Sequence, residues 1–186
     1  DSLTTISAYA FKNGLADSDV SRIVINVVES LGYPSVDEIV GSSIALLSNG
    51  RPVVLLNYYA AYYADPKTEV FMLGADNRWL NIGEFKTGYA AIKIGPDDMP
   101  VIFYKDKDDS EKIKVKKWVI GKDWQYLGSP GSYGSIDNGV IGPDNKPSFA
   151  YSNCLKQWQY GTTWKEITYE SLNGASCLSL AIGSDN

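Results

Sequence analysis

The sequence predicts an all-β protein made of repeated four-stranded antiparallel units. The stretch 141–151, Ile-Gly-Pro-Asp-Asn-Lys-Pro-Ser-Phe-Ala-Tyr, recurs at 94–104, more loosely at 46–56, and as a truncated copy at 182–186. Three prolines in these copies, Pro52, Pro100 and Pro147, lie 48 and 47 residues apart. An aromatic residue recurs at a similar period, as Tyr33, Trp79, Trp124 and Trp164. A regular repeat of this length constrains the fold more than any local pattern does.

The composition agrees with a turn-rich β protein. The chain of 186 residues has 17 Gly, 13 Tyr and 5 Trp but 2 Met, and 44% of its residues are hydrophobic. Tyrosine and tryptophan favour half-buried pleated surfaces, and glycine favours turns. We therefore expect one domain over residues 1–186 and no long helices.

Each repeat is interpreted as four short strands. An Asn-Gly hairpin turn at 48–50 joins the first two strands of one repeat, followed by a loop at 58–66 and a turn at 74–78. The predicted strands of this repeat are 43–47, 52–57, 69–73 and 79–82. Those of the next two are 89–94, 100–104, 112–118 and 124–127, then 139–141, 147–152, 156–160 and 164–167. Strands are also predicted at 1–11 and 21–28.

Four strands per period, a Gly/Asp turn between the first two and an aromatic residue opening the fourth make the chain resemble a β-propeller. The resemblance covers the whole chain and matches no specific propeller family, since the Trp-Asp and Gly-Gly signatures of two common families are absent. It implies four four-stranded antiparallel blades. Their approximate bounds are 175–186 plus 1–39, 40–83, 84–128 and 129–174.

The phase of the repeats at the two ends predicts how the ring closes. The last copy stops at Asn186 before its second strand, and the chain begins with what looks like that strand. Closing a ring through a blade shared by both termini removes unpaired strand edges. We favour a monomeric four-bladed ring. The alternatives are a homodimer with eight blades, or half of a larger propeller. The chain starts at Asp1, so it is either a processed fragment or a chain whose leader has been removed.

The net charge of −5 argues against a nucleic-acid partner. The one basic stretch, 112–117, alternates lysine with apolar residues, as a solvated strand face does. No apolar run reaches the ~18 residues that a membrane-spanning helix needs, so no membrane partner is expected. Two cysteines, Cys154 and Cys177, fall on adjacent blades and could form one disulfide; two reduced thiols are the alternative. A disulfide would indicate a secreted or extracellular protein.

The longer loops lie at one end of the predicted blades, and we expect recognition there. The most unusual of them is 57–65, whose Tyr58, Tyr59, Tyr62, Tyr63 and Asp65 are the ligand-binding candidates. Tyrosine rings stack on sugars or anchor a protein partner at low entropic cost. The alternative is that these rings pack between blades.

Metal and catalytic sites receive little support from the sequence. Asp106, Asp108 and Asp109 are weak Ca²⁺ candidates without the spacing of a calcium loop, so no cofactor is expected. With no histidine the chain cannot form a Ser-His-Asp or Cys-His centre, and no carboxylate pair is singled out. We expect a non-catalytic, secreted, lectin-like carbohydrate-binding module. The alternative is a protein-interaction or assembly subunit of a larger propeller, and the third hypothesis is a glycoside-active enzyme.

Overall fold

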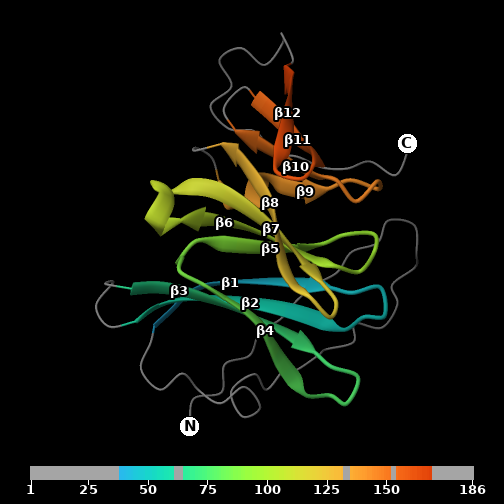
Figure 1. Ribbon diagram of the computed structural model, residues 1–186. Coiled ribbons are helices and arrows are strands. Elements are labelled where there is room, and N and C mark those ends of the chain that lie inside the picture. Colours follow the sequence, from blue (N-terminus) through green and yellow to red (C-terminus); the bar gives the residue numbers. More distant parts are fainter. Residues whose placement is uncertain (1–37, 61–64, 132–134, 152–153, 169–186) are drawn as a thin grey trace, which may run out of the picture.

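The computed structural model describes residues 38–60, 65–131, 135–151 and 154–168, which form three four-stranded antiparallel sheets (Figure 1). In each sheet the strands lie side by side in chain order. The first sheet contains β1 (Glu38–Leu46), β2 (Pro52–Ala60), β3 (Asp65–Leu73) and β4 (Trp79–Phe85). The second contains β5 (Ala90–Ile94), β6 (Pro100–Asp106), β7 (Lys112–Val119) and β8 (Asp123–Gly131). The third contains β9 (Gly139–Ile141), β10 (Pro147–Tyr151), β11 (Cys154–Tyr160) and β12 (Thr163–Thr168).

Two short 3₁₀ helices, η1 (Lys107–Asp109) and η2 (Ile136–Asn138), complete the described elements. The described residues include no helix with the length and apolar content to cross a membrane. All twelve predicted strands that fall within the described residues are present. The two predicted strands at 1–11 and 21–28, and the blade bounds that depend on them, lie outside the described residues.

The predicted loop at 58–66 is wrong at both ends. Strand β2 continues to Ala60 and β3 already begins at Asp65, with Tyr58 opposite Lys67 and Tyr59 opposite Pro66. The aromatic residues continue the strand because they favour a pleated surface and here have a paired partner strand. The two strands therefore form a longer hairpin than the sequence indicated.

The three inner hairpin turns have the same construction. In each, the residue at the left-handed position is one that tolerates positive φ: Gly50 (78°), Asp98 (60°) and Asn145 (60°). The residue before it accepts a hydrogen bond from the backbone N–H two positions later, through Asn49 (3.0 Å), Asp97 (3.3 Å) and Asp144 (3.2 Å). The repeated sequence thus produces a repeated local structure.

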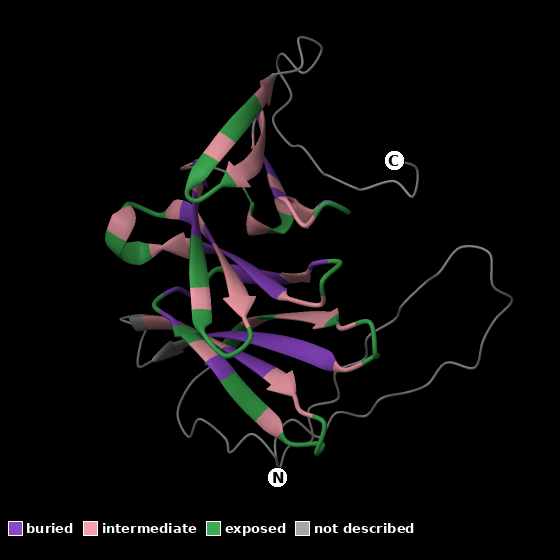
Figure 2. Ribbon diagram, turned by 45° about the vertical axis from the view of Figure 1, so that its right-hand side comes forward, coloured by how far each residue is buried: buried purple, intermediate pink, exposed green. Residues whose placement is uncertain are grey.

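The second sheet is buried on both faces. Strand alternation directs Ile102 and Tyr104 toward the first sheet, where they pack with Val53 and Leu55. The residues between them, Val101 and Phe103, pack with Phe149 of the third sheet. Figure 2 shows these buried stretches in purple along the middle strands, while the outer strand β4 carries more exposed residues. The continuous apolar run of β6 is what a strand buried on both faces requires.

Tryptophan hydrogen bonds connect the outer strands of the second and third sheets to the outer strand of the preceding sheet. The indole Nε1 of Trp124 in β8 donates to the Ile82 carbonyl of β4 at 2.5 Å, and Trp164 in β12 donates to the Leu127 carbonyl of β8 at 2.8 Å. Gly83 lies against the Trp124 indole, with no room for a side chain. The three sheets follow one another in the manner of successive propeller blades, although the described residues do not close a ring.

Candidate functional site

The structure places Tyr58 inside the molecule. Its side chain is 3% exposed, and Lys67 Nζ lies 5.7 Å from the centre of its ring. The same ammonium pairs with Glu69 (3.1 Å) and Glu84 (2.7 Å). Burial, reinforced by Glu69, raises the pKa of the Tyr58 hydroxyl well above its usual range. Tyr58 therefore does not present an open stacking face.

The other members of the tyrosine candidate group are less fully described. Tyr59 lies in β2 and Asp65 opens β3. Tyr62 and Tyr63 lie outside the described residues. A part in ligand binding for these four residues stays a prediction.

The acidic segment after β6 is engaged with lysines. Asp106 pairs with Lys114 (2.7 Å) and also caps η1 by accepting from the Asp108 N–H (2.9 Å). Asp109 pairs with Lys112 (2.9 Å) and Lys114 (3.2 Å), and both lysines hold the pKa of its carboxyl below the usual value. Within the described ranges, no three histidine, cysteine, aspartate or glutamate side chains are grouped so that they could hold a metal ion.

Cys154 begins β11 and is buried, and this burial raises the pKa of its thiol. It forms no disulfide with a described residue. Cys177 lies outside the described residues, so the predicted disulfide stays a prediction.

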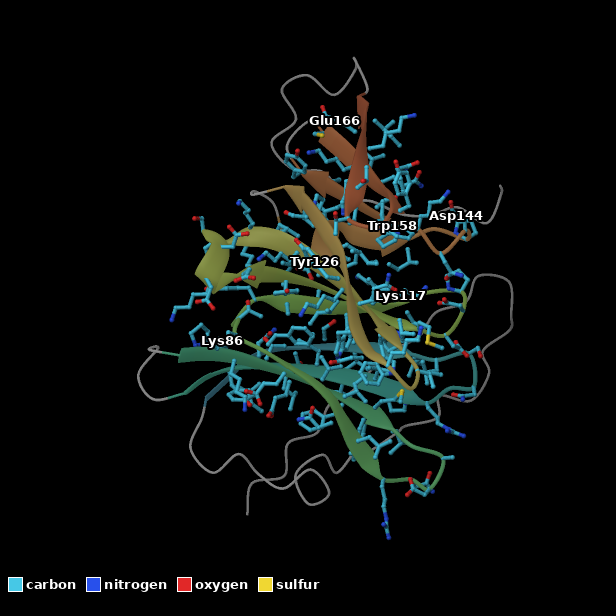
Figure 3. The ribbon with its side chains drawn as sticks, in the orientation of Figure 1. Lys86, Lys117, Tyr126, Asp144, Trp158 and Glu166 are labelled. Carbon is cyan, nitrogen blue, oxygen red and sulfur yellow. The ribbon has the colours of Figure 1, made fainter. Side chains whose placement is uncertain are left out.

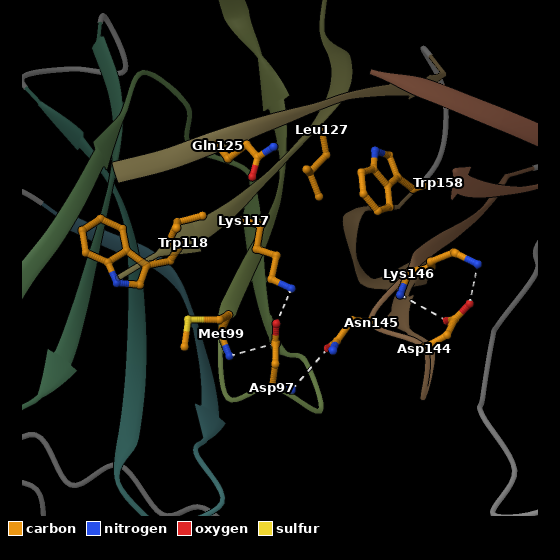
Figure 4. A pocket seen from close by; sticks show the side chains of 11 residues that line it. Asp97, Met99, Lys117, Trp118, Gln125, Leu127, Asp144, Asn145, Lys146 and Trp158 are labelled. Carbon is orange, nitrogen blue, oxygen red and sulfur yellow. Dashed lines mark hydrogen bonds and ion pairs between the residues drawn. The ribbon is translucent and has the colours of Figure 1, made fainter. Parts of the chain in front are cut away.

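A pocket of about 350 Å³ lies between the second and third sheets (Figure 4). It is at the end that carries the tight hairpin turns, whereas the sequence led us to expect recognition at the end with the longer loops. Figure 3 places Lys117, Asp144 and Trp158 near one another on one side of the molecule. The lining comprises Asp97, Met99, Lys117, Trp118, Val119, Gln125, Leu127, Asp144, Asn145, Lys146 and Trp158.

The charged groups of this inter-sheet pocket form two ion pairs. Lys117 Nζ lies 2.5 Å from Asp97 Oδ2, and Lys146 Nζ lies 2.9 Å from Asp144 Oδ2. Lys146 holds the pKa of the Asp144 carboxyl below its usual value. Asn145 joins the two turns, because its Oδ1 accepts from the Asp97 N–H at 3.2 Å.

Trp158 supplies the aromatic wall of the inter-sheet pocket. It comes from β11, and its ring points toward Leu127 in Figure 4. Its Nε1 donates to the Gly161 carbonyl at 3.0 Å, which fixes the orientation of the ring. The Trp118 ring instead turns away, toward the first sheet, and lies 5.6 Å from the Trp124 ring. The pocket thus combines one available indole face with several hydrogen-bonding side chains.

Sequence reasoning missed this site. Asp97 and Asp144 belong to the Gly/Asp turns of the repeat, but the sequence did not show that the two turns face each other across a hollow. The signal that could have found the site is a comparison of the repeats position by position, since Lys117 and Gln125 replace apolar residues at equivalent positions of the preceding repeat.

No family model matches the chain, and neither does any curated protein. Among solved structures, the chain is similar to virginiamycin B lyase from Staphylococcus aureus. A catalytically inactive variant with quinupristin gives 10% identity and a TM-score of 0.43 over 75% of this chain and 61% of the other. The selenomethionine-substituted lyase gives 9% identity and a TM-score of 0.40 over 73% and 57%. The chain therefore spans less than two thirds of either structure, and this distant likeness bears on neither its ligand nor its chemistry.

Proposed function

We propose that the protein is a non-catalytic carbohydrate-binding module whose site is the inter-sheet pocket. The observation that carries the proposal is the Trp158 ring facing a hollow of about 350 Å³ that amide and charged side chains also line. Pockets for small ligands start near ~300 Å³ and combine apolar walls with a few placed polar groups. A sugar offers a C–H face for the indole and hydroxyl groups for the polar rim.

The carboxylates of the pocket favour binding over hydrolysis. A glycosidase of the usual kind needs one carboxyl group as a proton donor and a second as base or nucleophile. Here Asp97 and Asp144 are each neutralised by a lysine at 2.5 Å and 2.9 Å. Lys146 holds the pKa of the Asp144 carboxyl below its usual value, so Asp144 is not suited to donate a proton at neutral pH.

Sugar binding can be tested by tryptophan fluorescence and calorimetry with a panel of mono- and disaccharides. We expect Trp158→Ala to weaken the binding of the preferred sugar about tenfold, the effect of losing an aromatic contact of roughly 1.4 kcal/mol. Tyr160→Ala is the matched control, because Tyr160 lies on the same strand, is 72% exposed and does not line the pocket. The proposal is wrong if no sugar binds, or if the two variants bind alike while both remain folded.

We further propose that the chain closes as a four-bladed ring. The support is a second apolar cluster on the first sheet, on the face opposite the second sheet. Its members all come from the first sheet: Val54, Leu56, Tyr58 and Phe71, with Ile44 and Trp79 packed against them. Val54, Ile102 and Phe149 each follow the repeated proline by two positions, and the latter two pack on the preceding sheet. The first sheet therefore needs a preceding sheet as well, and the two ends of the chain carry the predicted strands to form it.

The mass in solution, measured by light scattering, tests closure. A mass near 20.4 kDa supports the single-chain ring. Twice that mass favours the eight-bladed dimer, in which a partner covers the first sheet. In the dimer the Tyr58 end of the first sheet would become an interface, and the protein-interaction function would gain support.

A further inference from the structure

We infer that the inter-sheet pocket selects an uncharged sugar residue and discriminates against acidic or sulfated sugars. This inference rests on the proposed function, and it names the ligand class of the same site. It follows from which polar groups of the pocket are already engaged and which are not.

The charged side chains of the inter-sheet pocket are engaged in ion pairs with one another. The two lysines and two aspartates of the lining form the pairs Lys117–Asp97 and Lys146–Asp144, so the lining has no net charge. An acidic ligand would meet no unpaired cation there. It would have to separate an existing pair or give up its own hydration without compensation, and either costs free energy.

The neutral amides are available. The side chain of Gln125, exposed on β8, makes no hydrogen bond to any described residue, and the Nδ2 of Asn145 is likewise without an acceptor among them. An amide offers both donors and an acceptor. A sugar hydroxyl also donates and accepts, so these amides can bind hydroxyl groups without any change in charge.

The fold does not require polar residues at the positions of Lys117 and Gln125. Lys117 lies opposite Val101, and its counterpart Met72 lies opposite Val53 in the first sheet. Gln125 follows Trp124, and its counterpart Leu80 follows Trp79. The equivalent positions between the first and second sheets are therefore apolar. Lys117 and Gln125 therefore belong to one junction of the described sheets, as residues of a specific site do, whereas the polar turn residues of the lining recur in the described repeats.

The test compares matched sugar pairs by calorimetry on the full chain: methyl glycosides of glucose, galactose and mannose against the corresponding uronic acids, at low and high NaCl. We expect at least one neutral glycoside to bind about tenfold more tightly than its uronic acid. We also expect its affinity to change less than about twofold with salt, because no net charge is neutralised on binding.

Gln125→Ala should weaken the neutral ligand about tenfold, as loss of a hydrogen bond worth roughly 1.4 kcal/mol does. Gln157→Ala is the control, because Gln157 alternates with Trp158 on β11 and so points away from the pocket. If neither member of any sugar pair binds, the proposed function itself fails. If a uronic acid binds as tightly as its neutral counterpart, or if the two glutamine variants bind alike, carbohydrate binding stands and selection for uncharged sugars is wrong.

Discussion

Asp98 connects two sheets from one exposed turn. Its carboxylate accepts from the backbone N–H of Ser48 at 2.7 Å and from the Ser48 hydroxyl, and both hydrogen bonds lower the pKa of Asp98. At the next junction Asn145 reaches the Asp97 N–H instead. The residue that corresponds to Ser48 is Pro96, which has no N–H to offer. The same turn position thus links neighbouring sheets at both junctions, and it accepts from the backbone N–H of Ser48 at one and of Asp97 at the other.

Asp98→Ala should lower the denaturant midpoint more than Asn77→Ala does. Both replace a residue with φ near 60°, but only Asp98 loses an inter-sheet partner. Urea unfolding of the two variants measures the difference. Equal midpoints would show that the Ser48 contact adds no stability.

Asp98→Asn isolates the charge. Because the folded-state pKa of Asp98 is lowered, its contribution is present above the unfolded pKa of about 4 and is lost as pH falls through the folded value. The gap in unfolding free energy between wild type and Asp98→Asn should therefore narrow with acidification, as urea unfolding at pH 7 and near pH 3 will measure. A gap that is constant with pH contradicts the assignment.

The pKa of Tyr104 predicts how the unfolding free energy falls at alkaline pH. Burial, with a smaller contribution from Asp106, raises its pKa to about 12. A raised folded-state pKa gives stability that is complete below the unfolded value of about 10 and is lost as pH rises toward the folded value. Tyr104→Phe should therefore lose less unfolding free energy between about pH 9 and pH 11 than wild type. Tyr160→Phe, at a 72% exposed position, should behave as wild type in the same urea titrations.

At the scale of the elements, neighbouring outer strands approach so closely that glycine is required between them. A Cβ at Gly83 would collide with the Trp124 indole, which donates to the adjacent Ile82 carbonyl. Gly128 has the same function in the next sheet, where a Cβ would meet the Thr162 backbone. At both junctions the carbonyl before the glycine accepts from a tryptophan, Trp124 or Trp164, although a Cβ would meet the tryptophan itself only at Gly83.

Gly83→Ala should destabilise the fold by about 1–3 kcal/mol, since it overpacks this junction and displaces the Trp124 hydrogen bond. The matched control is Gly41→Ala, whose Cβ would lie at an ordinary 3.4 Å from Asn57 Nδ2. Chemical denaturation measures both. A comparable loss of unfolding free energy in the two variants would mean that the outer strands separate easily. The contact with the Trp124 indole would then not restrict the residue at position 83.

At the scale of the whole molecule, the predicted extracellular location depends on the predicted disulfide. We expect Cys154 and Cys177 to be joined, which would stabilise the fold by about 3 kcal/mol for a loop of this size. The unreduced, denatured chain should then show no thiol to a chromogenic reagent, and two after reduction. Two thiols before reduction would remove the reason for placing the protein outside the cell.

The sequence determined the strands, because their signals are local. A strand was predicted at 139–141 and β9 occupies the same residues, since repeated turns and the alternation of apolar residues are both visible in the chain. The prediction failed between 58 and 66, where cross-strand pairing, and not local composition, decides how far a hairpin extends.

The inter-sheet pocket is a product of the tertiary structure alone. Asp97 and Asn145 are 48 residues apart in the chain, and only the packing of the second sheet on the third brings them into contact. Trp118 and its counterpart Trp158 each face the preceding sheet, but Trp118 packs against the core of the first sheet, whereas Trp158 lines the pocket beside the second. Strand formation depends on neighbours in sequence, whereas a site between sheets depends on how separate sheets meet.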